Sequence, residues 1–172
     1  MVKILLGCDG FGEDLKDKVK AHLLDENKNY EVIDYGCTEY YKAAAKVSTE
    51  LIKMNKTEDD ETKNVGMLFC GTGMGVSIIA NKFDGISAAT CENERAVRCS
   101  RAVNDANVLC MGGKFTSAED GCKMADAFLD QDFIQPPKSS TLDVPEWWSN
   151  DVENFLTTSK EGISEVLGNK ES

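Results

Sequence analysis

Residues 65–83 read VGMLFCGTGMGVSIIANKF and change from a strand-like to a helix-like pattern within a few positions. The first six residues are all apolar, which is typical of a strand that is buried on both faces of a sheet. Glycines at 71, 73 and 75 follow, and residues 76–83 then have helical spacing. The stretch therefore predicts a buried strand, a tight glycine-rich turn and a helix that begins directly after it.

The same alternation extends over most of the chain. Apolar runs that predict further strands lie at residues 2–8, 30–36, 85–91 and 106–112. Helical spacing of apolar residues recurs after four of the strands, at residues 13–25, 40–56, 92–104 and 117–131. Five strands that alternate with helices predict an α/β fold whose parallel sheet is covered on both faces. We expect this domain to occupy residues 1–138.

A tail of different composition begins near two prolines. Residues 139–172 carry seven acidic residues and two lysines, which is −5 of the formal charge of −11. The spacing of apolar residues predicts a helix in this acidic extension, with a stripe made of Trp147, Trp148, Val152, Phe155 and Leu156. We expect the stripe to pack on the domain or on a second subunit. The tail either extends a dimer interface or folds over the pocket and supplies Lys138.

Composition argues against several classes of partner. The chain has 172 residues with 19 Lys and Arg against 30 Asp and Glu, and an acidic protein repels nucleic-acid phosphates. Its apolar runs are shorter than the ~20 residues that span a bilayer. The seven cysteines form no CxxC pair and the chain has one histidine, so no zinc-site spacing is present. We expect a cytoplasmic protein that binds no metal, membrane or nucleic acid.

Two predicted strands end in residues that suit an anion. Ligands of an open α/β sheet bind beyond the carboxyl ends of its strands. Asp9 and Gly10 follow the first strand there, and CGTGMG (70–75) follows the third. Closely spaced glycines bring several N–H groups towards one point, which stabilises a phosphate or an enediolate, but they also allow tight strand–helix packing. The loop matches neither the dinucleotide-binding pattern nor the P-loop.

Three side chains at these strand ends can act on a substrate or serve the fold. A helix N-terminus and nearby amides favour the thiolate of Cys70, which can then act as a general base; the other interpretation is one more buried cysteine. Thr72 either donates a hydrogen bond to a substrate or caps the next helix. Asp9 either orients a substrate or caps the helix that follows it.

Four stretches of the chain together are similar to one known family. They are KILLGCDGFGEDLKDKVKAHL (3–23), YEVIDYG (30–36), CGTGMGVSIIANKFDGISAATC (70–91) and SRAVNDANVLCMGG (100–113). They resemble the type B ribose-5-phosphate isomerases, a family that includes the galactose-6-phosphate isomerase subunits. YGCTEYY, FTSAED and the acidic tail further resemble a eukaryotic branch that includes plant proteins named for DNA-damage tolerance.

The resemblance implies a Rossmann-like three-layer sandwich with a five-stranded sheet. It implies an enzyme that interconverts an aldose phosphate and a ketose phosphate through a cis-enediolate, without any cofactor. It also implies a homodimer, or a tetramer, with each active site built from two subunits. Cys70 takes the position of the base that moves the proton between C1 and C2. The other residues that the resemblance places at the site are Asp9, Gly10, Tyr40, Gly71, Thr72, Gly73, Met74, Gly75 and Asn104.

Departures from the family concern ring opening and phosphate binding. The family commonly has histidine at positions 10 and 103, the second of which opens the sugar ring; this chain has Gly10 and Val103. Residues 131–140, QDFIQPPKSS, replace the family's arginine-containing phosphate segment, and Lys114 replaces an arginine. Replacement charge would come from Arg95, Arg98, Arg101 or Lys114, unless the three arginines form a solvated helix face or surface ion pairs.

These departures leave several functions open. One is an isomerase of a tetrose phosphate, whose 4-phosphate blocks furanose closure, and another is an isomerase of a non-phosphorylated or differently charged sugar. The absent ring opener and phosphate segment favour a non-catalytic sugar-phosphate-binding homologue, whereas the retained Cys70, Thr72, Asp9 and Asn104 favour catalysis. A thiol redox function would require Cys8 beside Cys70.

Overall fold

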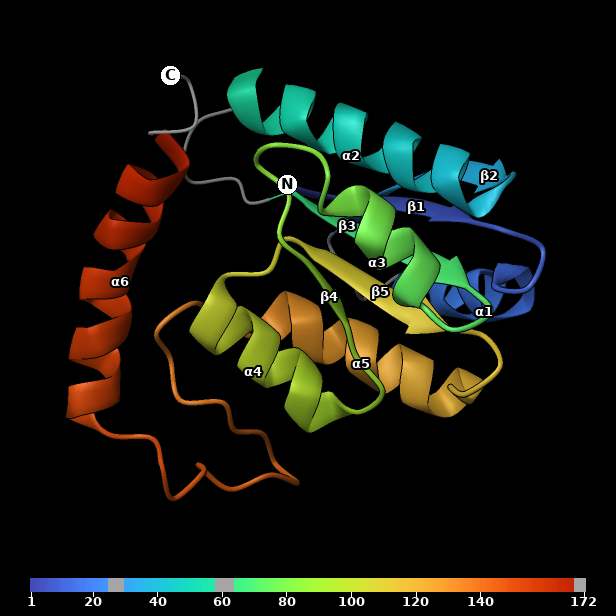
Figure 1. Ribbon diagram of the computed structural model, residues 1–172. Helices are drawn as coiled ribbons and strands as arrows, with labels where there is room; N and C mark the ends of the chain where they lie inside the picture. Colours follow the sequence, from blue (N-terminus) through green and yellow to red (C-terminus); the bar gives the residue numbers. More distant parts are fainter. Residues whose placement is uncertain (25–29, 58–63, 169–172) are drawn as a thin grey trace.

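A computed structural model describes residues 1–24, 30–57 and 64–168 of the chain. Five strands form one parallel sheet in the order β2–β1–β3–β5–β4 (Figure 1). The strands are β1 (Val2–Cys8), β2 (Tyr30–Cys37), β3 (Val65–Cys70), β4 (Ala88–Thr90) and β5 (Val108–Gly112). The strand order reverses between β1 and β3, so a crevice for ligands is expected at their carboxyl ends.

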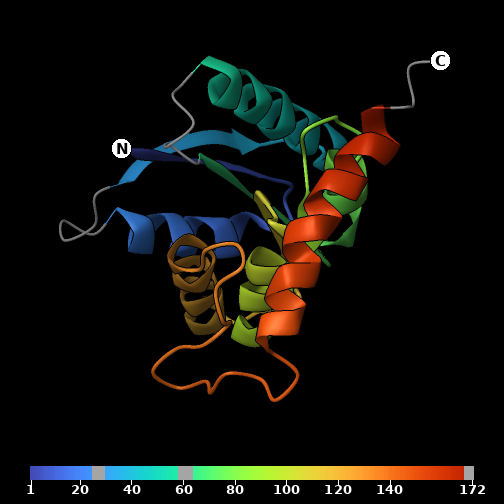
Figure 2. The same ribbon diagram turned by 90° about the vertical axis from the view of Figure 1, so that its left-hand side faces the viewer.

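Helices cover both faces of the sheet, as predicted. They are α1 (Glu13–Leu23), α2 (Tyr40–Thr57), α3 (Met74–Ala80), α4 (Glu94–Asn104), α5 (Ala118–Asp130) and α6 (Asn150–Gly168). Figure 2 shows α2 on one side of the sheet and α1, α4 and α5 on the other, while α6 lies alongside this sandwich. The predicted three-layer α/β architecture with a C-terminal helix is therefore confirmed.

The apolar run that ends in Cys70 supplies both hydrophobic cores. Side chains of a strand alternate between the two faces of its sheet. Met67 and Phe69 of β3 lie in the core shared with α1, α4 and α5, whereas Leu68 and Cys70 lie in the core shared with α2 and α3. Every residue of β3 is buried, which explains why the sequence shows no polar alternation there.

The acidic extension differs from its prediction at the helix start. Helix α6 begins at Asn150, so Trp147 and Trp148 precede it and do not belong to a helical stripe. The indole N–H of Trp148 donates to the carboxylate of Glu153 at 2.8 Å. The spacing of apolar residues did not predict this hydrogen bond. Leu156 is buried, but Phe155 is 68% exposed, so only part of the predicted stripe packs on the domain.

A buried ion pair joins α1 to β2. The Nζ atoms of Lys16 and Lys20 lie 2.9 Å and 2.8 Å from Oδ2 of Asp34, and the N–H of Gly36 donates to Oδ1 at 2.8 Å. Burial alone would raise the pKa of Asp34. The hydrogen bonds from Lys20, Gly36 and Lys16 outweigh it, so the pKa lies below its ordinary value.

Replacing Asp34 by Asn should lower the free energy of unfolding by about 3 kcal/mol at pH 7, because the charge of Lys16 stays buried without its main partner. The depressed pKa means that this stabilisation is present above the pKa of an unfolded aspartate, about 4, and is lost as pH falls through the folded value. Urea unfolding of the wild type and of Asp34→Asn should therefore show a difference in the free energy of unfolding that is smaller at pH 3 than at pH 7.

Asp17→Asn is the control for this variant. The Asp17 carboxylate also contacts Lys16 but is 60% exposed, so its loss should cost under about 1 kcal/mol. Equal costs for the two variants would contradict the prediction.

Candidate active site

The carboxyl ends of β1, β3 and β5 meet in a region where backbones touch. Cys70 pairs in register with Gly112 of β5. The N–H of Gly113 donates to the carbonyl of Cys70 at 2.8 Å, and the N–H of Lys114 donates to the carbonyl of Gly71 at 3.0 Å. The loop after β3 is thus attached to the turn after β5, which holds it in one conformation.

Two glycines are required by this arrangement. A Cβ on Gly112 would lie 2.7 Å from the carbonyl carbon of Thr72, closer than real contacts permit. Gly73 has a φ of 78°, which L side chains rarely adopt. Gly112 therefore permits close packing of β5 on the loop, and Gly73 turns its own N–H towards the sulfur of Cys70.

The thiol of Cys70 lies inside this turn. Its Sγ accepts a hydrogen bond from the N–H of Gly73 at 3.1 Å, and the residue is only 5% exposed. A backbone N–H directed at sulfur stabilises negative charge there. The hydroxyl of Thr72 accepts from the N–H of Met74 at 3.3 Å, so this side chain caps the turn, and its own proton is still available to donate.

Asp9 holds the neighbouring loop through one oxygen. Its Oδ1 accepts the N–H groups of Phe11 at 2.9 Å and Gly12 at 3.2 Å. The N-cap of α1 is Gly12, with no side-chain capping bond, so Asp9 organises the turn before the helix rather than the helix start itself. Oδ2 has no hydrogen-bond partner among the described residues, so it is free to accept a sugar hydroxyl.

Aromatic and basic side chains flank the Cys70 loop. The ring of Tyr40 packs on Gly75, at 3.2 Å from where a Cβ would lie. On the other side, the Nζ of Lys114 lies 5.5 Å from the centroid of the Phe11 ring. Phe11 is 66% exposed and was not among the predicted site residues; its position between two glycines of the first strand–helix turn is the signal that could have found it.

Most predicted site residues are brought together at this edge of the sheet. Space is open at Gly10, since apart from its two chain neighbours no described residue has an atom within 4 Å of the place that a Cβ would take, and Met74 is 51% exposed beside the loop. The group that shares the edge comprises Asp9, Gly10, Tyr40, Cys70, Gly71, Thr72, Gly73, Met74, Gly75 and Lys114.

Asn104 and Arg95 lie apart from that group. Asn104 is the last residue of α4 and lies shortly before the start of β5. Cys70, in contrast, pairs with the last residue of β5. One chain therefore places Asn104 and Cys70 at opposite ends of the sheet. Arg95, in the first turn of α4, donates through Nη1 to the carbonyl of Asp143 at 3.4 Å, so it contacts the tail.

The other two arginines of α4 are buried and serve the fold. Arg98 is 7% exposed, and its guanidinium contacts Glu94 at 2.8 Å and Asp130 at 3.3 Å; it forms ion pairs, as one alternative expected, but from a buried side chain. Arg101 is also buried and donates to the backbone carbonyls of Gln131 and Ala106. Neither arginine belongs to a solvated face or is available to a phosphate, because the packing of α4 on α5 withdrew both from solvent.

Cys8 is not placed to form a redox pair with Cys70. Its Sγ is directed at the carbonyl of Gly36, at 3.6 Å. Burial raises the pKa of the Cys8 thiol to about 12, so it stays protonated at neutral pH. The side chain of Cys8 lies in the core shared with α1, α4 and α5, whereas that of Cys70 lies in the core on the other face of the sheet, so the structure gives no support to a redox pair.

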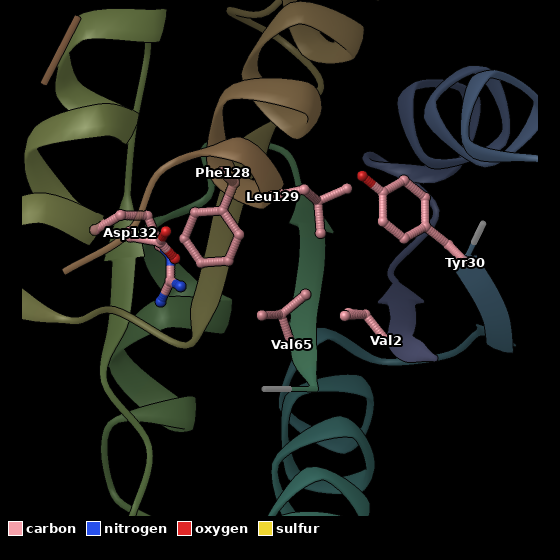
Figure 3. Close-up of a pocket in the computed structure, with 7 residues that line it drawn as sticks. Val2, Tyr30, Val65, Phe128, Leu129 and Asp132 are labelled. Carbon is pink, nitrogen blue, oxygen red and sulfur yellow. The ribbon is translucent and has the colours of Figure 1, made fainter. Parts of the chain in front are cut away.

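A small hollow lies at the amino ends of the strands, opposite to the Cys70 loop, and serves the fold rather than a reaction. It encloses about 260 Å³ and is lined by side chains from the amino ends of strands and from α5. Figure 3 labels Val2, Tyr30, Val65, Phe128, Leu129 and Asp132 among them. Arg101 also lines it, with its guanidinium 5.2 Å from the centroid of the Phe128 ring. Because that cation is already paired, it is not available for a reaction in the hollow.

The sequence matches a known protein family over most of its length. Residues 4–143 match the family model described as Ribose/Galactose Isomerase. The chain belongs to this family. Membership confirms the predicted resemblance and the prediction that the protein is an isomerase of sugars. None of the described helices has the length and apolar composition needed to cross a membrane.

Relatives of this isomerase differ in their named substrates. The 4-deoxy-4-sulfo-D-erythrose isomerase of Clostridium sp. (strain MSTE9) is 36% identical over 165 residues, which are 96% of this chain and 95% of that protein. The DNA damage-repair/toleration protein DRT102 of Arabidopsis thaliana is 34% identical over 96% of this chain, but these residues are only 50% of that protein. The solved structure of ribose-5-phosphate isomerase B from Clostridium thermocellum matches with a TM-score of 0.71 and 29% identity, over 96% of this chain and 99% of that one.

Proposed function

We propose that this isomerase interconverts the aldose and ketose forms of a four-carbon sugar with an anionic group on C4. The observation that carries the proposal is Val103, an apolar side chain at the position of the family's ring-opening histidine. A tetrose closes a furanose ring only through its 4-hydroxyl, so a phosphate or sulfonate at C4 keeps the sugar open. Such a substrate needs no ring opener. A relative that matches nearly the whole of both chains is named for a substrate of this kind.

The proposed reaction uses Cys70 as the base. Its thiolate, with the N–H of Gly73 on the sulfur at 3.1 Å, takes the proton from C2 of the aldose. The resulting cis-enediolate is stabilised by backbone amides of residues 71–75. The thiol returns a proton to C1 while a proton passes from O2 to O1, so the ketose has the same atoms and the same oxidation level overall. Thr72 and Oδ2 of Asp9 orient the sugar hydroxyls.

The proposed active site needs two chains. Cys70 and Asn104 lie at opposite ends of the sheet, so they cannot hold one four-carbon molecule within a single chain. A second copy that places its Asn104 over the Cys70 loop completes the site, which agrees with the homodimer implied by the family resemblance. The open position at Gly10 and the rings of Tyr40 and Phe11 border the space in which this second copy would lie.

Aldose–ketose exchange in D₂O, followed by NMR, tests the function. Sugars of four, five and six carbons should be compared, each with and without a terminal phosphate or sulfonate. We expect turnover with deuterium incorporation at the exchanged carbon for the C4-anionic tetroses, and slower turnover of pentose phosphates, which must first open a ring. Preference for a pentose phosphate, or absence of turnover with every sugar, would contradict the proposal.

A further inference from the structure

A groove separates α6 from the end of the sheet where Asn104 lies. It encloses about 770 Å³, between Val103, Asn104 and Phe133 on the domain and Leu156 and Lys160 on α6. Figure 1 shows α6 on the side where α4 ends and β5 begins. The groove thus contains both the residue expected to orient the sugar and the residue that replaces the ring opener, so α6 borders the same half of the active site.

Charge in this groove is concentrated on one lysine. Among the lining residues that the structure describes, Lys160 is the basic one and Asp105 the acidic one. Oδ1 of Asp105 lies 3.5 Å from Nη1 of Arg101, which offsets its charge. No carboxylate whose side chain the structure describes forms an ion pair with Lys160, whereas Lys123 pairs with Glu119 at 2.6 Å in the usual surface manner. Lys160 therefore offers its positive charge to whatever enters the groove.

Phe133 holds this lysine in position. The Nζ of Lys160 lies 5.4 Å from the centroid of the Phe133 ring, a cation–π contact. The next residue, Ile134, has a φ of 55°, unfavourable for a β-branched side chain, and its N–H donates to the carbonyl of Ala102 at 3.0 Å. This bond fixes the Phe133 segment against the end of α4. Residues 131–140 are the segment that replaces the family's arginine-containing one, and they here supply a ring that orients a cation from α6.

We infer that Lys160 binds the terminal phosphate or sulfonate of the substrate, in an active site completed by Cys70 of a second copy. The inference rests on the proposed function and assigns the charge that binds the C4 anion. Lys160 is a specificity-determining residue here, since an ammonium selects for a terminal anion and contributes nothing to proton transfer at C1 and C2. The exposed apolar residues of α6, such as Phe155 and Ile163, would be covered by that second copy.

Binding of unreactive alditols tests Lys160 independently of turnover. The probes are erythritol 4-phosphate, the corresponding C4 sulfonate and erythritol itself, titrated calorimetrically into the full chain. Lys160→Gln should weaken binding of both anions by about tenfold or more, since a charge-assisted hydrogen bond is lost, and leave erythritol unchanged. Lys160→Arg should restore most of the affinity. A loss of affinity confined to the two anions would support the inference.

Two control variants separate position from charge. Lys138→Gln removes the lysine just before the tail that one alternative of the sequence analysis assigned to the pocket, and Lys123→Gln removes a lysine of α5 paired with Glu119. Neither should change anion affinity. Equal affinity for Lys160→Gln and the wild type, or failure of the wild type to bind either anion, would overturn the inference. Tight, Lys160-dependent binding without any isomerisation would instead reject the proposed function and keep the anion site.

Discussion

Replacement of Cys70 by Ala is expected to lower kcat by about 10³-fold or more while the chain stays folded. General bases typically contribute about 10²–10⁴-fold, and loss of the thiol removes the proposed base itself. The cost in stability should be small, about 1–2 kcal/mol, because one buried sulfur and one hydrogen bond from Gly73 are lost. Substrate turnover followed by NMR, with urea unfolding of the same preparation, measures both effects.

Cys110→Ala provides the matched control for Cys70. Cys110 lies on β5, is completely buried and belongs to the same hydrophobic core as Cys70. Its removal should cost a similar amount of stability and leave kcat close to the wild-type value. A Cys70→Ala variant that keeps its activity would reject the assignment of the base, and equal loss of activity in both variants would show that packing, rather than proton transfer, was disturbed.

Mixing two inactive variants should restore about a quarter of the wild-type activity. Cys70→Ala and Asn104→Ala each damage every active site of their own homodimer, if each site takes one of these residues from each chain. Random pairing puts about half of the chains into mixed dimers, and one of the two sites in each mixed dimer is intact. Coexpression of the two variants with different tags, followed by purification through both, would give mixed dimers alone and about half of the activity.

A second mixture shows whether the recovery reports a shared site. Cys70→Ala and Asp9→Ala alter residues that lie at the same edge of one chain, so no site of a mixed dimer is complete. This pair should show no recovery. Recovery of activity when Cys70→Ala is mixed with Asp9→Ala, or no recovery when it is mixed with Asn104→Ala, would contradict an active site built across two chains. Either result would place the substrate wholly at the Cys70 edge.

Local patterns in the sequence were sufficient for most of the architecture. The run of apolar residues at 65–70 indicated a strand buried on both faces, and β3 is buried at every position. Each predicted strand–helix repeat lies within a few residues of its observed bounds, because strand and helix formation depend on spacing that neighbours in sequence supply. The tail was less predictable: Trp147 and Trp148 have helical spacing, but the helix begins after them, where Glu153 can accept the indole N–H of Trp148.

Side-chain roles depended on contacts between distant segments. The spacing of Arg98 and Arg101 is equally compatible with a solvated helix face, and only the packing of α4 against α5 and residues 131–132 shows that both are buried. The position of Lys160 is a similar case. Its neighbours in sequence give no hint of a role, which comes instead from Phe133, a residue far earlier in the chain whose ring centroid lies 5.4 Å from the ammonium.

The sequence by itself determined the sheet, the glycine-rich turn after β3 and the presence of Cys70, Thr72 and Asp9 at strand ends, because parallel strands bring their carboxyl ends to one edge. Asn104 lies between a predicted helix and the next predicted strand, so the same rule places it at the other edge. Only the tertiary structure decided that Arg98 and Arg101 are buried and that Lys160 is the basic one among the described residues that line the groove. The physical reason is that ion pairs and burial depend on which surfaces pack together. These contacts involve residues that are distant in the sequence and that no local pattern relates to one another.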